Sequence, residues 1–193
     1  MAKNILIILG HPARERKSFC EVLALAYKNS AAEAGHEVQM LNIAQLHFDP
    51  IVHEGYKGHQ PLEPEIADAQ DKIRWAEHLV IVYPLWQHMI PALLKGFLER
   101  TFTAGFAYAL KSQNPLKRGL LNGKSARLIQ TMGMPTIIYR FFYMAHGAKA
   151  LKSLFGFSGI GPVNITYCGT IEGSDQRRKR YIEKVASLGR VGA

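Results

Sequence analysis

The sequence has little cysteine and no long hydrophobic run. Cys20 and Cys168 are the only cysteines among the 193 residues and lie far apart, which excludes a disulfide framework and a CxxC motif. No apolar run approaches the roughly 20 residues that span a bilayer. The run 5–9 is short and lacks a cleavage site, so it predicts a first strand rather than a signal peptide. We therefore expect a cytoplasmic location and no stable membrane insertion.

Acidic residues are absent from one long segment. No Asp or Glu occurs between Glu99 and Glu172, whereas that interval holds nine Lys or Arg, within a chain of formal net charge +9. A surface of one sign concentrates anionic ligands, which include nucleotide cofactors and nucleic acid. Because the segment has neither zinc-finger spacing nor a recognition-helix motif, we expect no nucleic-acid partner.

Two common motifs for ligand sites are also missing. The glycine-rich fingerprint G-x-G-x-x-G of dinucleotide-binding folds does not occur. His47, His53 and His59 fall in one expected loop, but their spacing matches neither a helical His pair nor a Cys/His site. We therefore expect no metal.

Apolar runs alternate with helical patterns along the chain, which favours a parallel sheet covered by helices on both faces. The runs predict strands at about 4–9, 37–41, 79–83, 125–131 and 163–168. Helical patterns occupy about 18–34, 65–76, 91–100, 139–154 and 175–188. Without a repeat or a linker, we expect a single α/β domain over residues 1–193. Five strands at this spacing fit the flavodoxin-like order 2-1-3-4-5.

That strand order also predicts where a ligand binds. The order reverses between the first and third strands, which opens a crevice at the carboxyl ends of the strands. The loops at 11–19, 84–88 and 132–139 therefore line the expected site.

The most informative stretch joins the third strand to the next helix. It reads YPLWQHMIPALLKGFLER over residues 83–100, so a buried strand ends in a proline and an aromatic turn. Pro91 suits the first turn of the following helix, where its missing N–H costs nothing. An aromatic turn at the start of a helix suits the binding of a planar ring. The alternative is that Trp86 is an ordinary core residue.

This stretch resembles the flavodoxin-like NAD(P)H:quinone oxidoreductase family. Further matches are Gly10-His11-Pro12 after the first strand, Ser18-Phe19 at the first helix, and AGFAY over residues 104–108. The resemblance implies a flavin cofactor, FMN or FAD, with NAD(P)H as co-substrate. It also implies two-electron reduction of a quinone or similar flat electrophile, and usually a homodimer.

The first loop offers a phosphate site. Ser18 is placed to cap a helix whose N-terminus presents free N–H groups, and His11, Arg16 and Lys17 add donors or charge. A solvated basic loop is the alternative. By resemblance, His11, Ser18 and Phe19 match positions at the phosphate end of the flavin. Cys20 stands where one branch of the family carries an amide.

The second and third loops would hold the ring. We expect N–H groups after Pro84 to donate to the flavin, with Leu85, Trp86 and Gln87 along it. By resemblance, Thr131, Met132 and Gly133 wrap its pyrimidine end, although the family usually has Thr-Thr-Gly-Gly there. Tyr139 and His146 match a pair that handles charge on the reduced flavin and the quinone, and Tyr143 is a rival for the first role.

The apolar, aromatic stretch 137–157 has two interpretations. It predicts a dimer contact and a wall of the quinone pocket, whereas a buried core helix explains the same residues without a partner. Two other functions stay open. One is a flavodoxin-type electron carrier, which the basic charge disfavours because such carriers are typically acidic. The other is a regulatory flavoprotein that docks on a membrane transporter.

Overall fold

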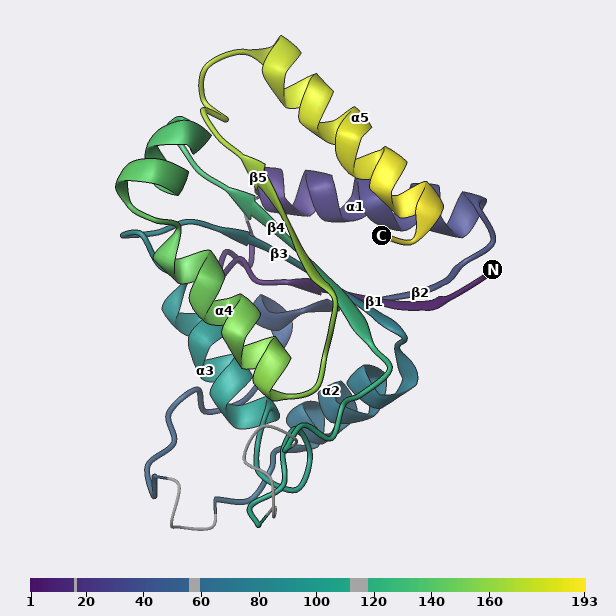
Figure 1. Cartoon of the computed structure of the whole chain (residues 1–193), viewed down its shortest axis with the longest axis vertical. Helices are drawn as coiled ribbons and strands as arrows, with labels where there is room; N and C mark the ends of the chain where they lie inside the picture. Colours follow the sequence, from purple (N-terminus) through teal and green to yellow (C-terminus); the bar gives the residue numbers. More distant parts are fainter. Residues whose placement is uncertain (16, 56–59, 112–117) are drawn as a thin grey trace.

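Strands and helices alternate along the chain, and the strands form one parallel sheet (Figure 1). The computed structural model describes residues 1–15, 17–55, 60–111 and 118–193. Its strands are β1 (Asn4–Leu9), β2 (Glu37–Asn42), β3 (His78–Pro84), β4 (Ser125–Thr131) and β5 (Val163–Cys168). All strand pairs are parallel and the order is β2-β1-β3-β4-β5, which confirms the predicted flavodoxin-like sheet.

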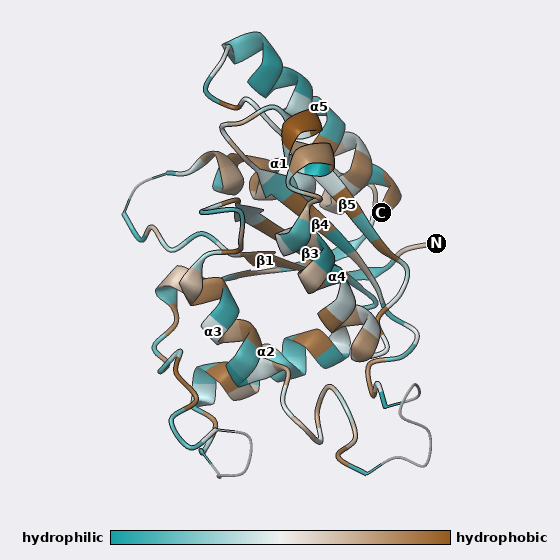
Figure 2. Ribbon diagram, turned by 60° about the vertical axis from the view of Figure 1, so that its left-hand side comes forward, coloured by the Kyte–Doolittle hydropathy of each residue, from teal (hydrophilic) through white to brown (hydrophobic). Residues whose placement is uncertain are grey.

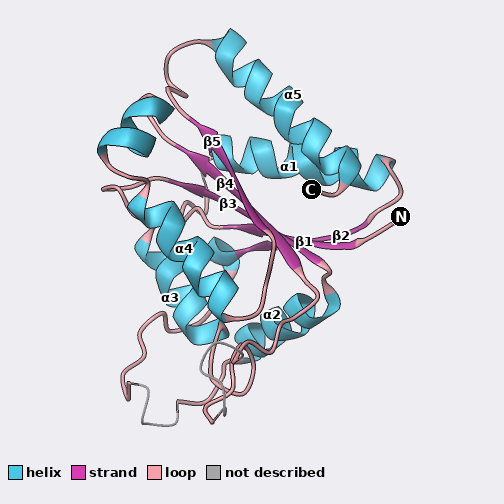
Figure 3. Ribbon diagram, viewed as in Figure 1, coloured by secondary structure: helices cyan, strands magenta, loops and turns pink. Residues whose placement is uncertain are grey.

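Helices cover both faces of this sheet (Figure 3). The helices are α1 (Phe19–Glu33), α2 (Pro64–Trp75), α3 (Ala92–Thr101), α4 (His146–Phe157) and α5 (Asp175–Val191). A 3₁₀ turn, η1 (Ile43–Gln45), follows β2, and a short π-helix, η3 (Ile138–Phe142), precedes α4. α1 and α5 pack on one face, and α2, α3 and α4 pack on the other.

The strand sequences explain this arrangement. Successive side chains of a strand point to opposite faces, and strands buried on both faces are apolar throughout. In β1, Leu6 and Ile8 enter the core beneath α2–α4, whereas Ile5 and Ile7 enter the core beneath α1 and α5. The helices, in contrast, carry both hydrophobic and hydrophilic residues, as expected when only one side meets the sheet (Figure 2).

The predicted helix over 139–154 is wrong, because this stretch is two segments. η3 ends at Phe142 and α4 begins at His146. Between them, Met144 and Ala145 have left-handed φ angles of 53° and 50°. The Tyr143 N–H donates to the Ile138 carbonyl at 3.2 Å, a five-residue step that widens the turn. Apolar periodicity continues through both segments, so the sequence pattern does not mark the break. A smaller correction is that Pro91 precedes α3 as its cap, and the helix begins at Ala92.

No helix in the described part of the chain combines the length and hydropathy that crossing a membrane requires. Cys20 and Cys168 are both free and buried.

Candidate active site

Three loops meet at the carboxyl end of the sheet, where the strand order predicts a crevice. The Gly10 N–H donates to the Val82 carbonyl at 2.8 Å, which joins the ends of β1 and β3. The Leu85 N–H donates to the Thr131 carbonyl at 2.7 Å, which joins the loops after β3 and β4. Cys20 Sγ lies 3.2 Å from Thr131 Oγ1, which ties the start of α1 to the end of β4. The first, second and third loops thus share one edge.

Burial controls the chemistry of the Cys20 thiol. Desolvation raises the pKa of Cys20 to about 12, against a smaller lowering by the contact with Thr131. Cys20 is therefore a neutral thiol at physiological pH and acts as a tether rather than a nucleophile.

The first loop caps α1 and reaches across to the second loop. Ser18 Oγ accepts the Glu21 N–H at 3.2 Å, as the sequence predicted for a helix cap. His11 Nδ1 accepts the Ala13 N–H at 3.1 Å, and the His11 ring meets the Trp86 ring edge to face at 5.6 Å. Lys17 is exposed beside the cap, whereas Arg16 falls outside the described residues.

A cation from the far end of the chain joins this loop. The Arg178 guanidinium of α5 lies over the half-buried Phe19 ring, 5.1 Å from its centre. The sequence analysis did not identify Arg178 as a neighbour of this loop. The packing of α5 on α1 creates it, and no local motif signals it. It adds positive charge next to the N-terminus of α1.

The second loop is a tight two-residue turn held in a strained conformation. Trp86 and Met89 exchange N–H···O=C hydrogen bonds of 3.0 and 2.9 Å. The two central residues, Gln87 and His88, have φ angles of 48° and 64°. This is the geometry of a type I′ turn, which normally takes Asn or Gly, so two larger side chains here are costly. Strain of this kind clusters at functional sites.

The turn also decides which backbone donors are available. The N–H groups of Leu85 and Trp86 already donate to Thr131 and Met89. The N–H groups of Gln87 and His88 have no acceptor among the residues that the structure describes. The backbone donors available after Pro84 are therefore the N–H groups of Gln87 and His88 at the tip of the turn, rather than those directly after the end of β3. Pro84 itself is buried at the end of β3.

A cavity of about 840 Å³ opens beside this turn. Pro12 of the first loop and Leu85, Trp86 and Gln87 of the second loop line it. Trp86 is 46% exposed, so the alternative that it is a core residue is wrong. The first residues of α3 close the far side of the cavity, whose lining is mainly apolar, as in small-molecule sites.

The third loop packs against the second through an apolar layer. Thr131 and Met132 are buried, and the Met132 N–H donates to the Cys168 carbonyl at 2.9 Å. Gly133 is exposed, and its N–H has no acceptor among the described residues. A Cβ added at Gly133 would lie 3.8 Å from its nearest neighbour, a carboxylate oxygen of Glu172, so the loop has open space at Gly133.

The predicted tyrosine and histidine occupy different surroundings. Tyr139 is fully buried, and its Oη accepts the Ala148 N–H of α4 at 3.3 Å. His146 is exposed as the first residue of α4. Tyr143, the rival of Tyr139, stacks on His88 of the second loop at 4.0 Å. Gly147 permits this approach, since an added Cβ would lie 2.8 Å from the His88 carbonyl oxygen.

Two buried polar side chains beneath the loops were not predicted. Tyr83 and Gln130 are paired neighbours in β3 and β4, and both are fully buried. The Tyr83 hydroxyl and both amide atoms of Gln130 have no hydrogen-bond partner in the described part of the chain. Burial raises the pKa of Tyr83, so the hydroxyl stays protonated. Buried polar atoms without partners are rare and mark sites with an additional ligand or water.

The histidines of the loop after β2 engage carboxylates. His47 Nδ1 lies 3.3 Å from Glu65, and His53 Nε2 lies 2.8 Å from Asp49. His59 falls outside the described residues. Within the described ranges, no three His, Cys, Asp or Glu side chains gather as a metal site would require.

A family model for the flavodoxin-like fold, Flavodoxin_2, matches residues 3–189. The chain belongs to this family. An uncharacterized NAD(P)H oxidoreductase of Haemophilus influenzae is 33% identical over 189 residues, which cover 95% of this chain and 92% of that protein. NAD(P)H dehydrogenase [quinone] 1 of Cavia porcellus is 30% identical, over 81% of this chain and 58% of that protein. These matches confirm the family resemblance that the motifs predicted.

Solved structures have the same fold. Smu.1420 from Streptococcus mutans has a TM-score of 0.81 and 31% identity, and the match covers 97% of this flavodoxin-like chain and 98% of that one. The NAD(P)H:quinone oxidoreductase of Methanothermobacter marburgensis has a TM-score of 0.80 at 24% identity, over 98% and 96%. An FMN-dependent NADH-azoreductase of Bacillus anthracis, solved with FMN, has a TM-score of 0.77 at 21% identity, covering both chains fully. The last two likenesses establish the fold alone.

Proposed function

We propose that this flavodoxin-like chain is a flavin-dependent NAD(P)H oxidoreductase that reduces quinones or similar flat electrophiles. The observation that carries the proposal is the strained turn from Trp86 to Met89, which walls a cavity at the carboxyl end of the sheet. Relatives named as an NAD(P)H oxidoreductase and an NAD(P)H dehydrogenase [quinone] support it. The enzyme would be a single domain over residues 1–193, and its two free cysteines favour the cytoplasm.

The residues present fit a flavin. The N-terminus of α1, with Ser18 as its cap and Arg178 nearby, suits a phosphate. The N–H groups of Gln87, His88 and Gly133 have no acceptor among the described residues and suit the polar edge of the ring, and Trp86 provides a flat wall. The proposed cofactor is FMN or FAD, and a structural neighbour that shares the fold was solved with FMN. A flavin held by these residues would supply the two-electron hydride chemistry that links NAD(P)H to the acceptor.

The side chains then have separate tasks in one cavity. Trp86 and Leu85 orient flat substrates and exclude water from the ring side. NAD(P)H and the acceptor would use this cavity in turn, as a ping-pong scheme requires. Reduction of a quinone to its hydroquinone consumes one hydride and one proton. Exposed His146 is placed to supply the proton, and buried Tyr139 positions it through the hydrogen bond to Ala148.

A basic cavity supports the choice of a nicotinamide nucleotide as the reductant. Arg140, Lys149 and Lys152 line a space of about 470 Å³ beside β5, and its described lining includes no acidic residue. Tyr167 lies 5.8 Å below the Arg140 guanidinium. Cations above an aromatic ring suit a phosphorylated nucleotide.

Homodimerisation is also part of the proposal. Ile137, Ile138, Phe141 and Phe142 are 44–77% exposed and form one apolar patch on η3. This exposure contradicts a buried core helix for the first half of the stretch 137–157. In the second half, Leu151 and Phe155 of α4 do enter the core. The patch on η3 is therefore the proposed contact between subunits. Sedimentation of the double variant Phe141→Asp, Phe142→Asp as a monomer, with wild type as a dimer, would support this contact.

The visible absorbance spectrum of the purified protein tests the function. Oxidised-flavin bands that bleach on anaerobic addition of NADPH, and return on addition of a quinone, are the expected result. Bands that do not bleach would favour an electron carrier or a transporter-regulating subunit instead. A protein that shows no bands after incubation with FMN and FAD would refute the proposal.

The residue test uses Trp86→Ala. Loss of one aromatic wall should weaken flavin binding by roughly tenfold, since ring stacking contributes about 1–3 kcal/mol. Trp75→Phe is the matched control, because Trp75 packs on the core beneath α2, away from the cavity. Equal flavin affinity for Trp86→Ala and wild type would contradict the placement of the ring.

A further inference from the structure

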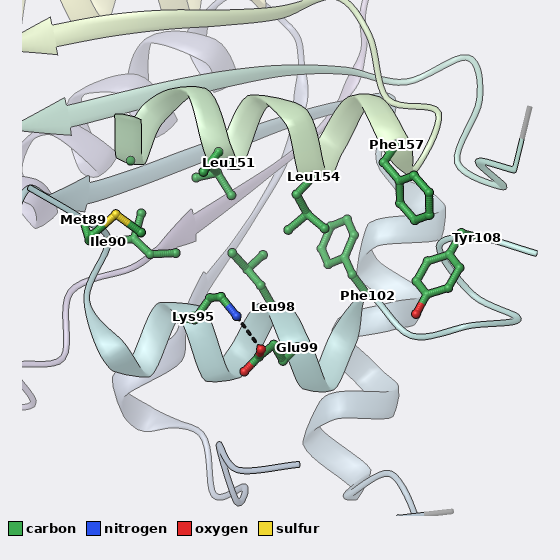
Figure 4. A pocket seen from close by; sticks show the side chains of 12 residues that line it. Met89, Ile90, Lys95, Leu98, Glu99, Phe102, Tyr108, Leu151, Leu154 and Phe157 are labelled. Carbon is green, nitrogen blue, oxygen red and sulfur yellow. Dashed lines mark hydrogen bonds and ion pairs between the residues drawn. The ribbon is translucent and has the colours of Figure 1, made fainter. Parts of the chain in front are cut away.

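A second cavity, the α3–α4 groove, runs between two helices on the face opposite α1 and α5. It has a volume of about 380 Å³ (Figure 4). Leu98 of α3, Phe102 at the end of that helix and Leu151 of α4 form its floor and are at most 5% exposed. Leu154 and Phe157 continue the α4 wall toward its far end. The groove is thus a preformed apolar channel rather than a flat patch.

The groove begins where the ring cavity ends. Met89, Ile90 and Lys95 line both spaces, so the cavity beside the Trp86–Met89 turn leads directly into the groove. Figure 4 shows Met89 and Ile90 at one end and Phe157 with Tyr108 at the other. A ligand whose ring occupies the first cavity can therefore extend a substituent along the second.

Charge in the groove is balanced. Lys95 and Glu99 are the charged residues of its described lining, and they form an ion pair with each other. No unpaired charge therefore faces an occupant, which favours a neutral hydrocarbon over an anionic chain such as a fatty acid.

The length of the groove sets the size of that hydrocarbon. α3 has 10 residues, which corresponds to about 15 Å at 1.5 Å per residue. Three single bonds of an extended chain span about 3.5 Å, so the four-bond repeat of an isoprenoid spans roughly 5 Å. The groove accommodates about three isoprene units.

We propose that the α3–α4 groove binds the isoprenoid tail of a quinone whose head group occupies the ring cavity. This inference rests on the proposed function for the identity of the head group. The groove itself makes a separate prediction, because a free prenyl alcohol should bind without any redox step. A second copy of the chain is the competing occupant, and the exposed patch on η3 already offers such a copy a different contact.

The test is calorimetric titration of the purified protein with prenyl alcohols of one, two and three isoprene units. Each added unit should tighten binding by at least about tenfold, because every buried methylene contributes about 0.8 kcal/mol. Ala150→Trp fills the groove, whereas Ser153→Trp places the same residue on α4 outside the lining. Ala150→Trp should abolish binding and Ser153→Trp should retain it. Phe157→Asp, at a position 46% exposed, is a second variant that introduces a charge.

Kinetic measurements separate this proposal from the proposed function. For wild type and Ser153→Trp, kcat/KM should rise with the tail length of the quinone, and for Ala150→Trp it should not. Prenyl-alcohol binding that Ala150→Trp abolishes would support the groove even if no quinone is turned over. Failure of wild type to bind the three-unit alcohol would overturn it. Conversion of a wild-type dimer to a monomer by Ala150→Trp, without alcohol binding, would assign the groove to a second copy and also overturn it.

Discussion

His78 should make the stability of this protein fall between neutral and mildly acidic pH. The side chain lies at the start of β3, is 3% exposed, and its Nδ1 lies 2.7 Å from Ser125 Oγ. Its Nε2 is buried without a partner among the described residues. Burial lowers the pKa of His78 to about 4, and the charges of Lys3, Arg127 and His36 add to this effect.

The sign and size follow from linkage. Unfolded His78 takes up a proton near pH 6.5, whereas the folded side chain does so only near pH 4. Acid therefore favours the unfolded chain, and stability present above pH 6.5 is lost progressively as the pH falls to 4. The difference in pKa corresponds to about 3 kcal/mol, a large part of the roughly 5–15 kcal/mol that stabilises a typical domain.

Urea unfolding at constant ionic strength between pH 7 and pH 4.5 measures this loss. The lower limit avoids carboxylates such as Glu63, whose pKa is already lowered by its hydrogen bond to Arg100 despite partial burial. His78→Asn keeps an amide near the Ser125 hydroxyl but cannot be protonated, so its unfolding free energy should be nearly flat over this range. His47→Asn, at an exposed site, is the matched control and should keep the wild-type slope. A wild-type slope in His78→Asn would refute the reasoning.

Three further predictions concern the site. Gly147→Ala should destabilise the protein by about 1–3 kcal/mol and weaken flavin binding, because the added Cβ would press on the His88 carbonyl. Gly156→Ala is the control, since a Cβ added at Gly156 would meet no atom within 4 Å. This variant should be neutral or stabilising in the same thermal and flavin titrations. Gln130→Leu should stabilise the flavin-free protein by about 1–3 kcal/mol in chemical unfolding, since it removes an unpartnered buried amide, and a loss of stability would show that the amide is satisfied. Lys149→Glu should raise KM for NADPH several-fold at low salt and less at high salt, and a salt-independent KM would exclude a role for the basic cavity.

The sheet was predictable because it depends on local apolar runs, and a cavity lies at the edge that the strand order indicated. β4 and β5 have the predicted bounds, since each is a short apolar-rich run between loops. The crevice followed from the strand order, which needs only the number and spacing of the strands. Trp86 was predicted from its place in the motif, and its exposure agrees with a cavity wall.

The contacts between distant elements were not predictable in this way. Arg178 reaches Phe19 because α5 packs closely on α1, where an added Cβ at Gly189 would lie 2.5 Å from the Tyr27 carbonyl oxygen. A single sequence does not report which glycine serves such a crossing. The break between η3 and α4 was missed for a different reason. Hydrophobic periodicity reports which face is buried, whereas the break depends on φ angles at Met144 and Ala145.

The second loop and the link between η3 and α4 both hold strained backbone and pack against each other. The Trp86–Met89 turn and the Met144–Ala145 link each hold two residues other than glycine in left-handed conformations, at a cost of order 1 kcal/mol or more per residue. They meet where His88 stacks on Tyr143 and where Gly147 admits the turn against α4. The N–H groups at the tip of the turn, which have no acceptor among the described residues, therefore depend on a segment about 60 residues further along the chain, because tertiary packing overrides local propensity. A change in η3 or α4 should alter flavin affinity without touching the ring cavity.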